Sequence, residues 1–334
     1  MSVHPVSRVC CCLLVLLSWV AGTDTALAAH PGQAKLVQEV AHDTGQSPAA
    51  LNALLDGATK QQSILDAISR PAEAKPWKDY RPIFLTDARI DGGIAFYQQH
   101  RALLDRIATE YGVAPQYVVA IIGVETNYGR IVGRYKVLDA LVTLGFHYPP
   151  RAPFFRDELK TLLELPASKL AGPLDSLVGS YAGAQGWGQF MPSSIRDYAV
   201  DEDHDGRIDL HDSADDIVAS VANYLHGYGW ERDAPVAARA QPDAKARASD
   251  LNELMPKHPL EQFEAWGYAP LQRIDPGRLA SLQQLEGPAG PEYWFTFQNF
   301  YVITRYNRSP LYAMAVEQLA QAIAAGVAQA DAAR

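Results

Sequence analysis

The stretch VVAIIGVETNYGR, residues 118–130, places one acidic residue at the end of an almost unbroken apolar run. Pro115 precedes the run and favours the first turn of a helix, while Gly129 and Gly133 follow it closely. A helix that is apolar all round is buried, so the sequence predicts Glu125 near the end of a core helix. Burial removes water from a carboxylate, which is costly for its charged form.

Two interpretations of Glu125 follow from the residues around it. In the first, the carboxylate pairs with a nearby cation such as Arg130 at the helix end and has a structural role only. In the second, partial burial raises the pKa and keeps the carboxyl group protonated near neutral pH. Cleavage of a glycosidic bond requires such a proton donor beside the leaving oxygen. The apolar run by itself is compatible with both.

Residue types that are typical of carbohydrate sites occur in the loops of this chain. Sugars stack on aromatic rings, and amide and hydroxyl groups hydrogen bond to the ring substituents. The glycine-rich segment GSYAGAQGWGQFMP, residues 179–192, has no helical or strand period and predicts a shaped loop. The candidate side chains are Trp77, Tyr80, Tyr128, Tyr181, Trp187, Tyr224, Tyr306 and Tyr312, with Ser180, Gln189 and Asn307.

The acidic segment DEDHDGRIDLHD, residues 201–212, has the spacing of an EF-hand calcium loop. Its ligand, turn and apolar positions are filled, in order, by Asp201, Asp203, Asp205, Gly206, Arg207 and Ile208. Arg207 would supply only its backbone carbonyl. Oxygen ligands without sulfur or imidazole suit Ca²⁺ rather than zinc. The alternative is a solvated acidic turn that binds no ion.

The last ligand of this loop is ambiguous in the sequence. Position 12 holds Asp212, whose side chain is shorter than the usual glutamate and reaches less far. Asp215 and Asp216 follow it and are alternatives. A single loop of this kind indicates a structural site rather than a calcium sensor.

Residues 1–28 have the pattern of a secretory signal peptide. Arg8 precedes the apolar stretch 9–20, and Ala26-Leu27-Ala28 fits the small-residue cleavage motif, so we predict cleavage before Ala29. The apolar stretch is short for a spanning helix, although a membrane anchor is the alternative interpretation. All three cysteines lie in this segment, so the mature chain would have no disulfide.

The charge balance argues against two classes of partner. The formal net charge is −9 over 334 residues, and no Lys/Arg cluster is present. This composition disfavours nucleic acid and electrostatic docking on anionic lipid. A mature chain of roughly 300 residues can bury a sufficient core without disulfides, in two or three lobes.

The hydrophobic periodicity predicts a mainly α (α+β) chain. Helical patterns cover residues 35–70, 94–112 and 217–230, and a final helix begins behind Ser309-Pro310. Between residues 234 and 300 short alternating runs suggest small strands, and the run YWFTFQNFYVITRYN extends this pattern to residue 307.

Four motifs together resemble the B-type lytic murein transglycosylases: GVETNYGRIVGRYKVLDALVTLGFHYPPRA, GSYAGAQGWGQFMPSS, DHDGRIDL…SVANYL and NFYVITRYNRSPLYAMAV. The resemblance covers the chain from about residue 35 to residue 325. It implies a goose-lysozyme-like catalytic core with an EF-hand-like calcium loop, a helical lobe and a small β-rich lobe that contributes to the cleft. The implied boundaries are 111–233 for the core, 29–110 with 308–334 for the helical lobe, and 234–307 for the β-rich lobe.

The resemblance also implies the reaction and the site. The reaction is non-hydrolytic cleavage of the β-1,4 bond between N-acetylmuramic acid and N-acetylglucosamine in peptidoglycan, which leaves a 1,6-anhydromuramoyl end. Glu125 matches the single catalytic acid/base, and the C6 hydroxyl of the sugar is the nucleophile. The matching substrate-binding residues are Tyr80, Ser180, Gln189, Tyr224, Tyr306, Asn307 and Tyr312. The matching calcium ligands are Asp201, Asp203, Asp205, Arg207 and Asp216, with Asp215 as an alternative for the last.

For its location and partners, the resemblance together with the leader predicts a soluble periplasmic monomer that acts on peptidoglycan strands. It predicts structural Ca²⁺, no organic cofactor, no nucleic acid and no stable membrane anchor; partners among the wall-synthesis proteins stay open. Two alternatives differ in class. One is a hydrolytic muramidase, and the other is a calcium-stabilised glycan-binding or scaffold protein without turnover.

Overall fold

The computed structural model describes residues 30–69, 75–247 and 251–333, so the predicted signal peptide, residues 1–28, lies outside the described residues. The helices are α1 (Gln33–Thr44), α2 (Pro48–Asp56), α3 (Gln62–Ile68), α4 (Trp77–Phe84), α5 (Asp87–Gln99), α6 (Arg101–Tyr111), α7 (Pro115–Thr126), α8 (Val137–His147), α9 (Ala152–Glu164), α10 (Pro192–Tyr198), α11 (Ala214–Gly227), α12 (Leu260–Ala265), α13 (Gln298–Tyr306) and α14 (Pro310–Ala332). The strands are β1 (Tyr135–Lys136), β2 (Val178–Gly179), β3 (Ala237–Pro242), β4 (His258–Pro259), β5 (Tyr268–Pro270), β6 (Leu279–Gly287) and β7 (Gly290–Thr296). The fold is mainly helical with a small sheet, as predicted.

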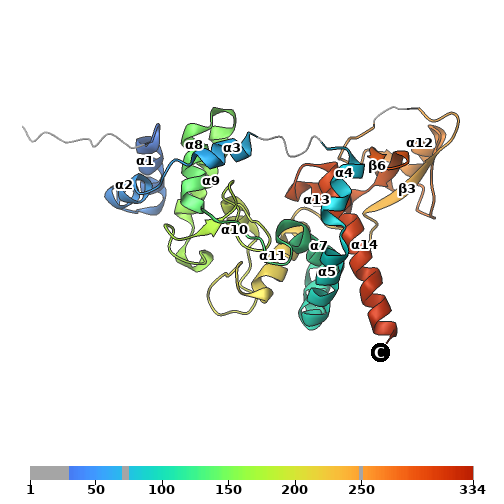
Figure 1. The fold of residues 1–334 in the computed structure, drawn as a ribbon, viewed down its shortest axis with the longest axis horizontal. Helices are drawn as coiled ribbons and strands as arrows, with labels where there is room; N and C mark the ends of the chain where they lie inside the picture. The colour runs from blue at the N-terminus through green and yellow to red at the C-terminus, as the bar shows by residue number, and fades with distance from the viewer. Residues whose placement is uncertain (1–29, 70–74, 248–250, 334) are drawn as a thin grey trace, which may run out of the picture.

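Helix α7 is the centre of the fold. It begins at Pro115, every residue from Tyr117 to Val124 is buried, and it ends where Asn127 adopts a left-handed conformation (φ 50°). α5 and α14 pack along it, so α7 is covered by helices that precede and follow it in the sequence (Figure 1). The apolar run therefore forms the predicted core helix, with Glu125 in its last turn.

The predicted helical lobe of residues 29–110 with 308–334 is divided in the structure. α4, α5 and α14 pack together, but α1 packs on α9 and α3 on α8, at the opposite end of the molecule (Figure 1). The backbone N–H of Thr59 donates to Asp139 Oδ1 (2.9 Å), and that of Gln61 donates to Thr143 Oγ1 (3.0 Å). Residues 30–69 thus belong with the region predicted as the core. The periodicity of a helix shows which face is apolar but not which element covers it.

The predicted helix over residues 94–112 is two helices. α5 ends at Gln99 and α6 begins at Arg101, because His100 leaves the helical conformation (φ −110°, ψ 20°). α5 packs mainly on α14 and α7, whereas α6 packs mainly on α11. The break lets one amphipathic segment cover two different neighbours.

The β-rich lobe is an antiparallel sheet of five strands in the order β4-β6-β7-β3-β5. Its own small core includes Phe263, Phe295 and Phe297. The predicted strand run does not continue to residue 307, because residues 298–306 form α13. Asn299 fixes this turn into helix: its Nδ2 donates to the carbonyl of Glu231 (2.8 Å), and its Oδ1 accepts from the N–H of the same residue (2.7 Å).

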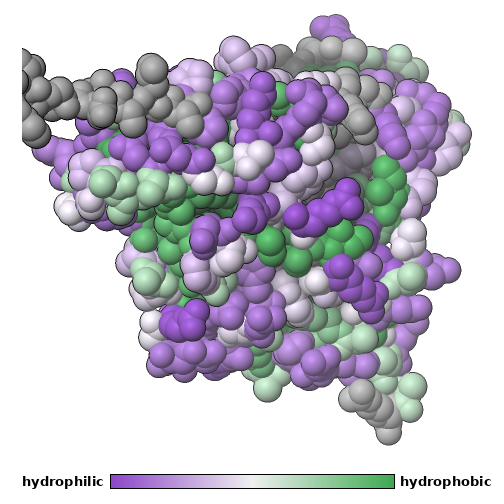
Figure 2. Space-filling model, turned by 60° about the vertical axis from the view of Figure 1, so that its left-hand side comes forward, coloured by the Kyte–Doolittle hydropathy of each residue, from purple (hydrophilic) through white to green (hydrophobic). Residues whose placement is uncertain are grey.

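One face of the molecule is shown in Figure 2, and it is largely polar. On the face in Figure 2, hydrophilic residues predominate and hydrophobic residues gather in a band across the middle. Among the described residues, α14 is long and apolar enough to cross a membrane, and α6 and α7, bent by 111°, pass the same test as a pair. More than half of the apolar window of α14 (56%) is buried inside the protein, which is typical of a core helix.

Candidate active site

A cavity of about 560 Å³ lies beside the C-terminal end of α7, and Glu125 is in its wall. The remaining lining residues come from the segment after α7 and from the glycine-rich loop: Arg130, Ile131, Val132, Gly133, Arg134, Tyr135, Ser180, Tyr181 and Gln189. The volume is typical of sites that hold small ligands. We call it the Glu125 cavity.

The carboxyl group of Glu125 is held by a tyrosine and not by a cation. Tyr312 donates its hydroxyl hydrogen to Glu125 Oε1 at 2.6 Å. Arg130 lines the same cavity, but no ion pair joins it to Glu125 in the described part of the chain. Burial raises the pKa of Glu125 to about 7, against the smaller lowering by the Tyr312 hydrogen bond. The structure therefore favours the protonated acid over the structural ion pair.

The turn after α7 holds Glu125 at the cavity. Asn127, Tyr128 and Gly129 all have positive φ (50°, 60° and 78°), so the helix stops abruptly. Thr126 Oγ1 donates to the carbonyl of Trp187 (2.9 Å) and accepts from the N–H of Gly129 (3.0 Å). A Cβ at Gly129 would lie 2.2 Å from the Trp187 ring, so only glycine fits. These contacts fix the end of α7 against the glycine-rich loop.

Short backbone contacts join the glycine-rich loop to residues 130–135, which form the second wall of the Glu125 cavity. β1 pairs with β2, with Tyr135 opposite Gly179. A Cβ at Gly133, whose φ is +97°, would lie 2.1 Å from the carbonyl oxygen of Gly179. Gln189 Nε2 donates to the carbonyls of Val132 (3.2 Å) and Gly186 (3.0 Å).

Ser180 lies in the same loop, where it both shapes the backbone and lines the cavity. Ser180 Oγ accepts from the N–H groups of Ala184 (3.0 Å) and Ala182 (3.3 Å), which shapes the loop, while the residue lines the Glu125 cavity. The predicted residues Ser180 and Gln189 are therefore brought to the wall that contains Glu125.

Three predicted tyrosines support Glu125. Besides Tyr312, Tyr306 donates its hydroxyl to the carbonyl of Gly188 (2.7 Å), and the rings of Tyr224 and Tyr306 are 4.6 Å apart. Tyr224 donates to the carbonyl of Arg305 (2.7 Å). Burial and the neighbouring Glu125 charge hold the pKa of Tyr306 and Tyr312 well above the usual range, so both stay protonated donors. Two of the three hydroxyls are bound to backbone, which indicates support of the site rather than direct binding of a sugar.

Tyr80 and Asn307, like the three tyrosines above, are not among the residues that line the Glu125 cavity. Tyr80 is buried in the hydrophobic core, where its ring lies 5.1 Å from that of Phe84. α4 uses its apolar face to pack on α14 and β6, which takes Tyr80 inward. Asn307 is exposed just past the end of α13. A role of Tyr80 or Asn307 in substrate binding therefore stays a prediction.

The sequence did not predict that residues 130–135 line the Glu125 cavity. This wall contains Arg130, Arg134 and the exposed side chain of Ile131. The available signal was the pair Gly129 and Gly133, whose spacing after a core helix marks a shaped segment. The chemical role of the residues between them had no sequence signal.

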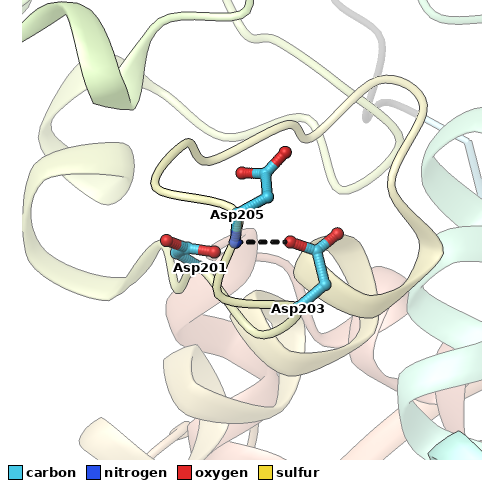
Figure 3. A group of neighbouring side chains, drawn as sticks. All are labelled: Asp201, Asp203 and Asp205. Atoms are coloured by element: carbon cyan, nitrogen blue, oxygen red, sulfur yellow. Dashed lines mark hydrogen bonds between the residues drawn. The ribbon is translucent and has the colours of Figure 1, made fainter.

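The acidic loop brings three carboxylates together. Asp201, Asp203 and Asp205 each offer one oxygen within 4.8 Å of the others, and Figure 3 shows all three on one turn. The N–H of Gly206 donates to Asp201 Oδ2 (3.0 Å), and that of Asp205 to Asp203 Oδ1 (3.2 Å). Asp201 Oδ1 is buried and has no hydrogen-bond partner. An unpaired buried carboxylate oxygen at the first ligand position fits a cation such as Ca²⁺.

Asp216 is not in this cluster. It is buried, and its oxygens accept from the N–H groups of Glu202 (2.8 Å) and Asp209 (2.7 Å). The alternative residue, Asp215, accepts from Arg106 (3.1 Å). Asp216 thus braces the two ends of the loop, and a role as last calcium ligand stays a prediction. The same holds for the carbonyl of Arg207, whose N–H donates to Asp205 Oδ1 (2.8 Å).

Comparison with known proteins identifies the family of this chain. A family model described as the Transglycosylase SLT domain matches residues 28–321. The chain is 39% identical over 307 residues to the membrane-bound lytic murein transglycosylase B of Escherichia coli (strain K12), covering 89% of this chain and 84% of that protein.

Solved structures show the same fold. The soluble lytic transglycosylase SltB1 of Pseudomonas aeruginosa is 46% identical, with a TM-score of 0.83 over 89% of this chain and 99% of that chain. The E. coli lytic transglycosylase Slt35 in complex with calcium is 38% identical, with a TM-score of 0.82 over 90% of this chain and 95% of that chain. The chain therefore belongs to the Transglycosylase SLT domain family, as a lytic transglycosylase of the group that includes these murein enzymes.

Proposed function

We propose that this enzyme cleaves the β-1,4 bond between N-acetylmuramic acid and N-acetylglucosamine in peptidoglycan and leaves a 1,6-anhydromuramoyl end. The observation that carries the proposal is the sheltered carboxyl of Glu125, with its pKa raised to about 7, in the wall of a ligand-sized cavity. Membership of the family supports the reaction class. The single acid/base and the anhydro product are our inference.

Glu125 would act first as an acid and then as a base. Its proton passes to the glycosidic oxygen as the bond from that oxygen to the muramoyl C1 breaks. The resulting carboxylate takes the proton of the C6 hydroxyl, whose oxygen forms the new bond to C1. The proton returns to Glu125, so no water is consumed and the residue is ready for another cycle.

An internal nucleophile agrees with the number of acids at the site. Hydrolytic glycosidases usually use a second carboxylate to activate water or to form a covalent intermediate. Among the described residues that line the Glu125 cavity, Glu125 is the one carboxyl group. A hydroxyl of the substrate has a high effective concentration and needs no second carboxylate. Tyr312 would stabilise the carboxylate that exists between the two proton transfers.

Calcium would have a structural role. Asp201, Asp203 and Asp205 would hold the ion, which supplies positive charge to three clustered carboxylates. The loop follows α10 and leads into α11, which contains Tyr224, whose ring lies 4.6 Å from that of Tyr306. We therefore infer that the ion stabilises the scaffold and takes no part in the chemistry.

Export to the periplasm is part of the same proposal. It is supported by the signal-peptide pattern of residues 1–28 and by the location of peptidoglycan outside the cytoplasmic membrane. The substrate partner is the glycan strand, and action as a monomer stays a prediction.

Product analysis tests the proposed function. We expect mass spectrometry of digested peptidoglycan to show muropeptides that are lighter by one water than the hydrolysis products, because an anhydro end forms without water. The second candidate, a hydrolytic muramidase, would yield reducing ends only, and that result would overturn the proposal. The substrate treated without enzyme is the control for anhydro ends already present in it.

A further inference from the structure

A second cavity, of about 580 Å³, shares no lining residue with the Glu125 cavity. Its walls come from the start of α7, the connection between α11 and β3, the connection between β5 and β6, and one face of α14. It therefore lies where the helical part meets the β-rich lobe. Tyr117 in its wall precedes Glu125 by eight residues of α7, about 12 Å along the helix axis.

A buried acid lies in the wall of the second cavity. Glu317 is 7% exposed, and its carboxyl oxygens accept hydrogen bonds from Tyr117 Oη (2.8 Å) and Gln321 Nε2 (3.2 Å). Burial raises its pKa to about 7. The same two helices form both acid–tyrosine pairs. At Glu125 the acid comes from α7 and the tyrosine from α14, whereas at Glu317 the acid comes from α14 and the tyrosine from α7.

The proposed reaction does not require Glu317. A buried acid is costly, and Val316 and Leu319 beside it on α14 are apolar and fully buried. Polar groups that converge in a cavity, with a perturbed acid among them, are typical of a ligand site.

The mouth of the second cavity carries charges of both signs. Asp233, Asp275 and Arg273 are exposed lining residues, and none of them forms an ion pair in the described part of the chain. Arg278, also in the wall, is already paired with Glu231 at 3.0 Å. The unpaired groups offer two carboxylates to an ammonium group and one guanidinium to a carboxylate.

The other polar lining groups suit a peptide. The amides of Gln116 and Gln321 can donate to and accept from peptide bonds. A neutral saccharide would leave Asp233, Asp275 and Arg273 without ionic partners, so the charges favour a zwitterionic ligand.

We propose that the second cavity binds a short peptide with a free amine and a free carboxylate, supplied by the peptide stems of peptidoglycan. This rests on the proposed function, which places the enzyme on a polymer that bears such stems. Asp233 and Asp275 bind the ammonium group, and Arg273 binds the carboxylate. A stem held about 12 Å or more from the cleaved bond gives the enzyme a second attachment to the strand, which raises its effective concentration at the bond.

Calorimetric titration of the intact protein tests this site. The probe is N-acetyl-L-Ala-γ-D-Glu-meso-diaminopimelate, whose remaining amine is free. We expect binding that weakens about tenfold or more in the double variant Asp233→Asn/Asp275→Asn, and equally when the probe's free amine is acetylated. Asp66→Asn, which removes an exposed carboxylate on α3 far from the cavity lining, is the matched control and should bind like the wild type.

Three results would overturn the peptide site. The first is that the probe fails to bind, and the second is that it binds the double variant as tightly as the wild type. The third is that a peptide-free tetrasaccharide of N-acetylglucosamine displaces it. The two proposals fail separately. Anhydro products without probe binding refute the second cavity alone, whereas probe binding without anhydro products refutes the proposed function alone.

Discussion

Glu125→Gln is expected to lower the rate of glycan cleavage by about 10³–10⁴-fold, since general acid–base catalysis contributes up to this amount. Glutamine has nearly the shape of glutamic acid and can still accept from Tyr312, but it can neither give a proton to the leaving oxygen nor take one from the C6 hydroxyl. Cleavage of purified peptidoglycan, measured as released muropeptide per unit time, gives the rate. Binding to the intact polymer should be unchanged.

The same variant should not be less stable than the wild type above neutral pH. Folding raises the pKa of Glu125 from 4.5 to about 7, so the folded state binds this proton more tightly than the unfolded chain. The stability from this group is fully present below pH 4.5 and is lost as the pH rises through about 7. Glutamine stays neutral, so the variant keeps that stability at higher pH.

Glu158→Gln is the matched control for activity. Glu158 is also buried, but its oxygens accept from the N–H (2.9 Å) and hydroxyl (2.6 Å) of Ser193, away from the Glu125 cavity. This change is expected to reduce stability while the folded protein keeps its cleavage rate. A Glu125→Gln protein that retains the wild-type rate would refute the assignment of the acid.

Removal of calcium is expected to give the second large effect, on stability. An ion that binds only the folded state at 100 times its Kd adds about 2.7 kcal/mol to the free energy of unfolding. For a mature chain of roughly 300 residues that corresponds to a rise in Tm of about 4 °C. We expect the stabilisation because the ion would neutralise three carboxylates whose oxygens lie within 4.8 Å of one another. It would also give a partner to Asp201 Oδ1, which is buried without one. Thermal unfolding in EDTA, and again after CaCl₂ is restored, measures the shift.

Asp201→Asn separates this site from general effects of the ion. The variant loses the carboxylate at the first ligand position, so its Tm should respond to CaCl₂ much less than that of the wild type. Asp66→Asn changes an exposed acid on α3, outside the acidic loop, and should leave the response unchanged. An identical Tm for the wild type in EDTA and in CaCl₂ would show that the loop is a solvated acidic turn.

Local features of the fold could be predicted from the sequence because their causes are local. The apolar run, Pro115 and the following glycines define α7, and the Asp spacing with Gly206 defines the acidic loop. Ser309 and Pro310 mark the start of α14, where Ser309 Oγ accepts from the N–H of Tyr312 (3.4 Å).

Features that depend on distant partners could not be predicted. Residues 298–306 alternate like a strand, yet the ladder ends at Thr296 and Asn299 binds the backbone of Glu231, so the chain turns into α13. Tyr80 has the residue type of a sugar-stacking group, but its ring is buried beside Phe84, and its role in substrate binding stays a prediction. The hydroxyl that binds Glu125 comes from Tyr312, 187 residues away, and it was assigned to the cleft by resemblance only.

The central claim is that Glu125 holds its proton near neutral pH, and infrared difference spectroscopy of its carboxyl stretch during a pH titration tests this most directly. Glu317 titrates in the same range, so the spectrum of Glu125→Gln is subtracted from that of the wild type to isolate one group. We predict a protonated carboxyl that disappears with a midpoint at about pH 7. A midpoint near the ordinary value of 4.5 would mean a carboxylate at neutral pH, which cannot protonate the leaving oxygen, and would contradict the account.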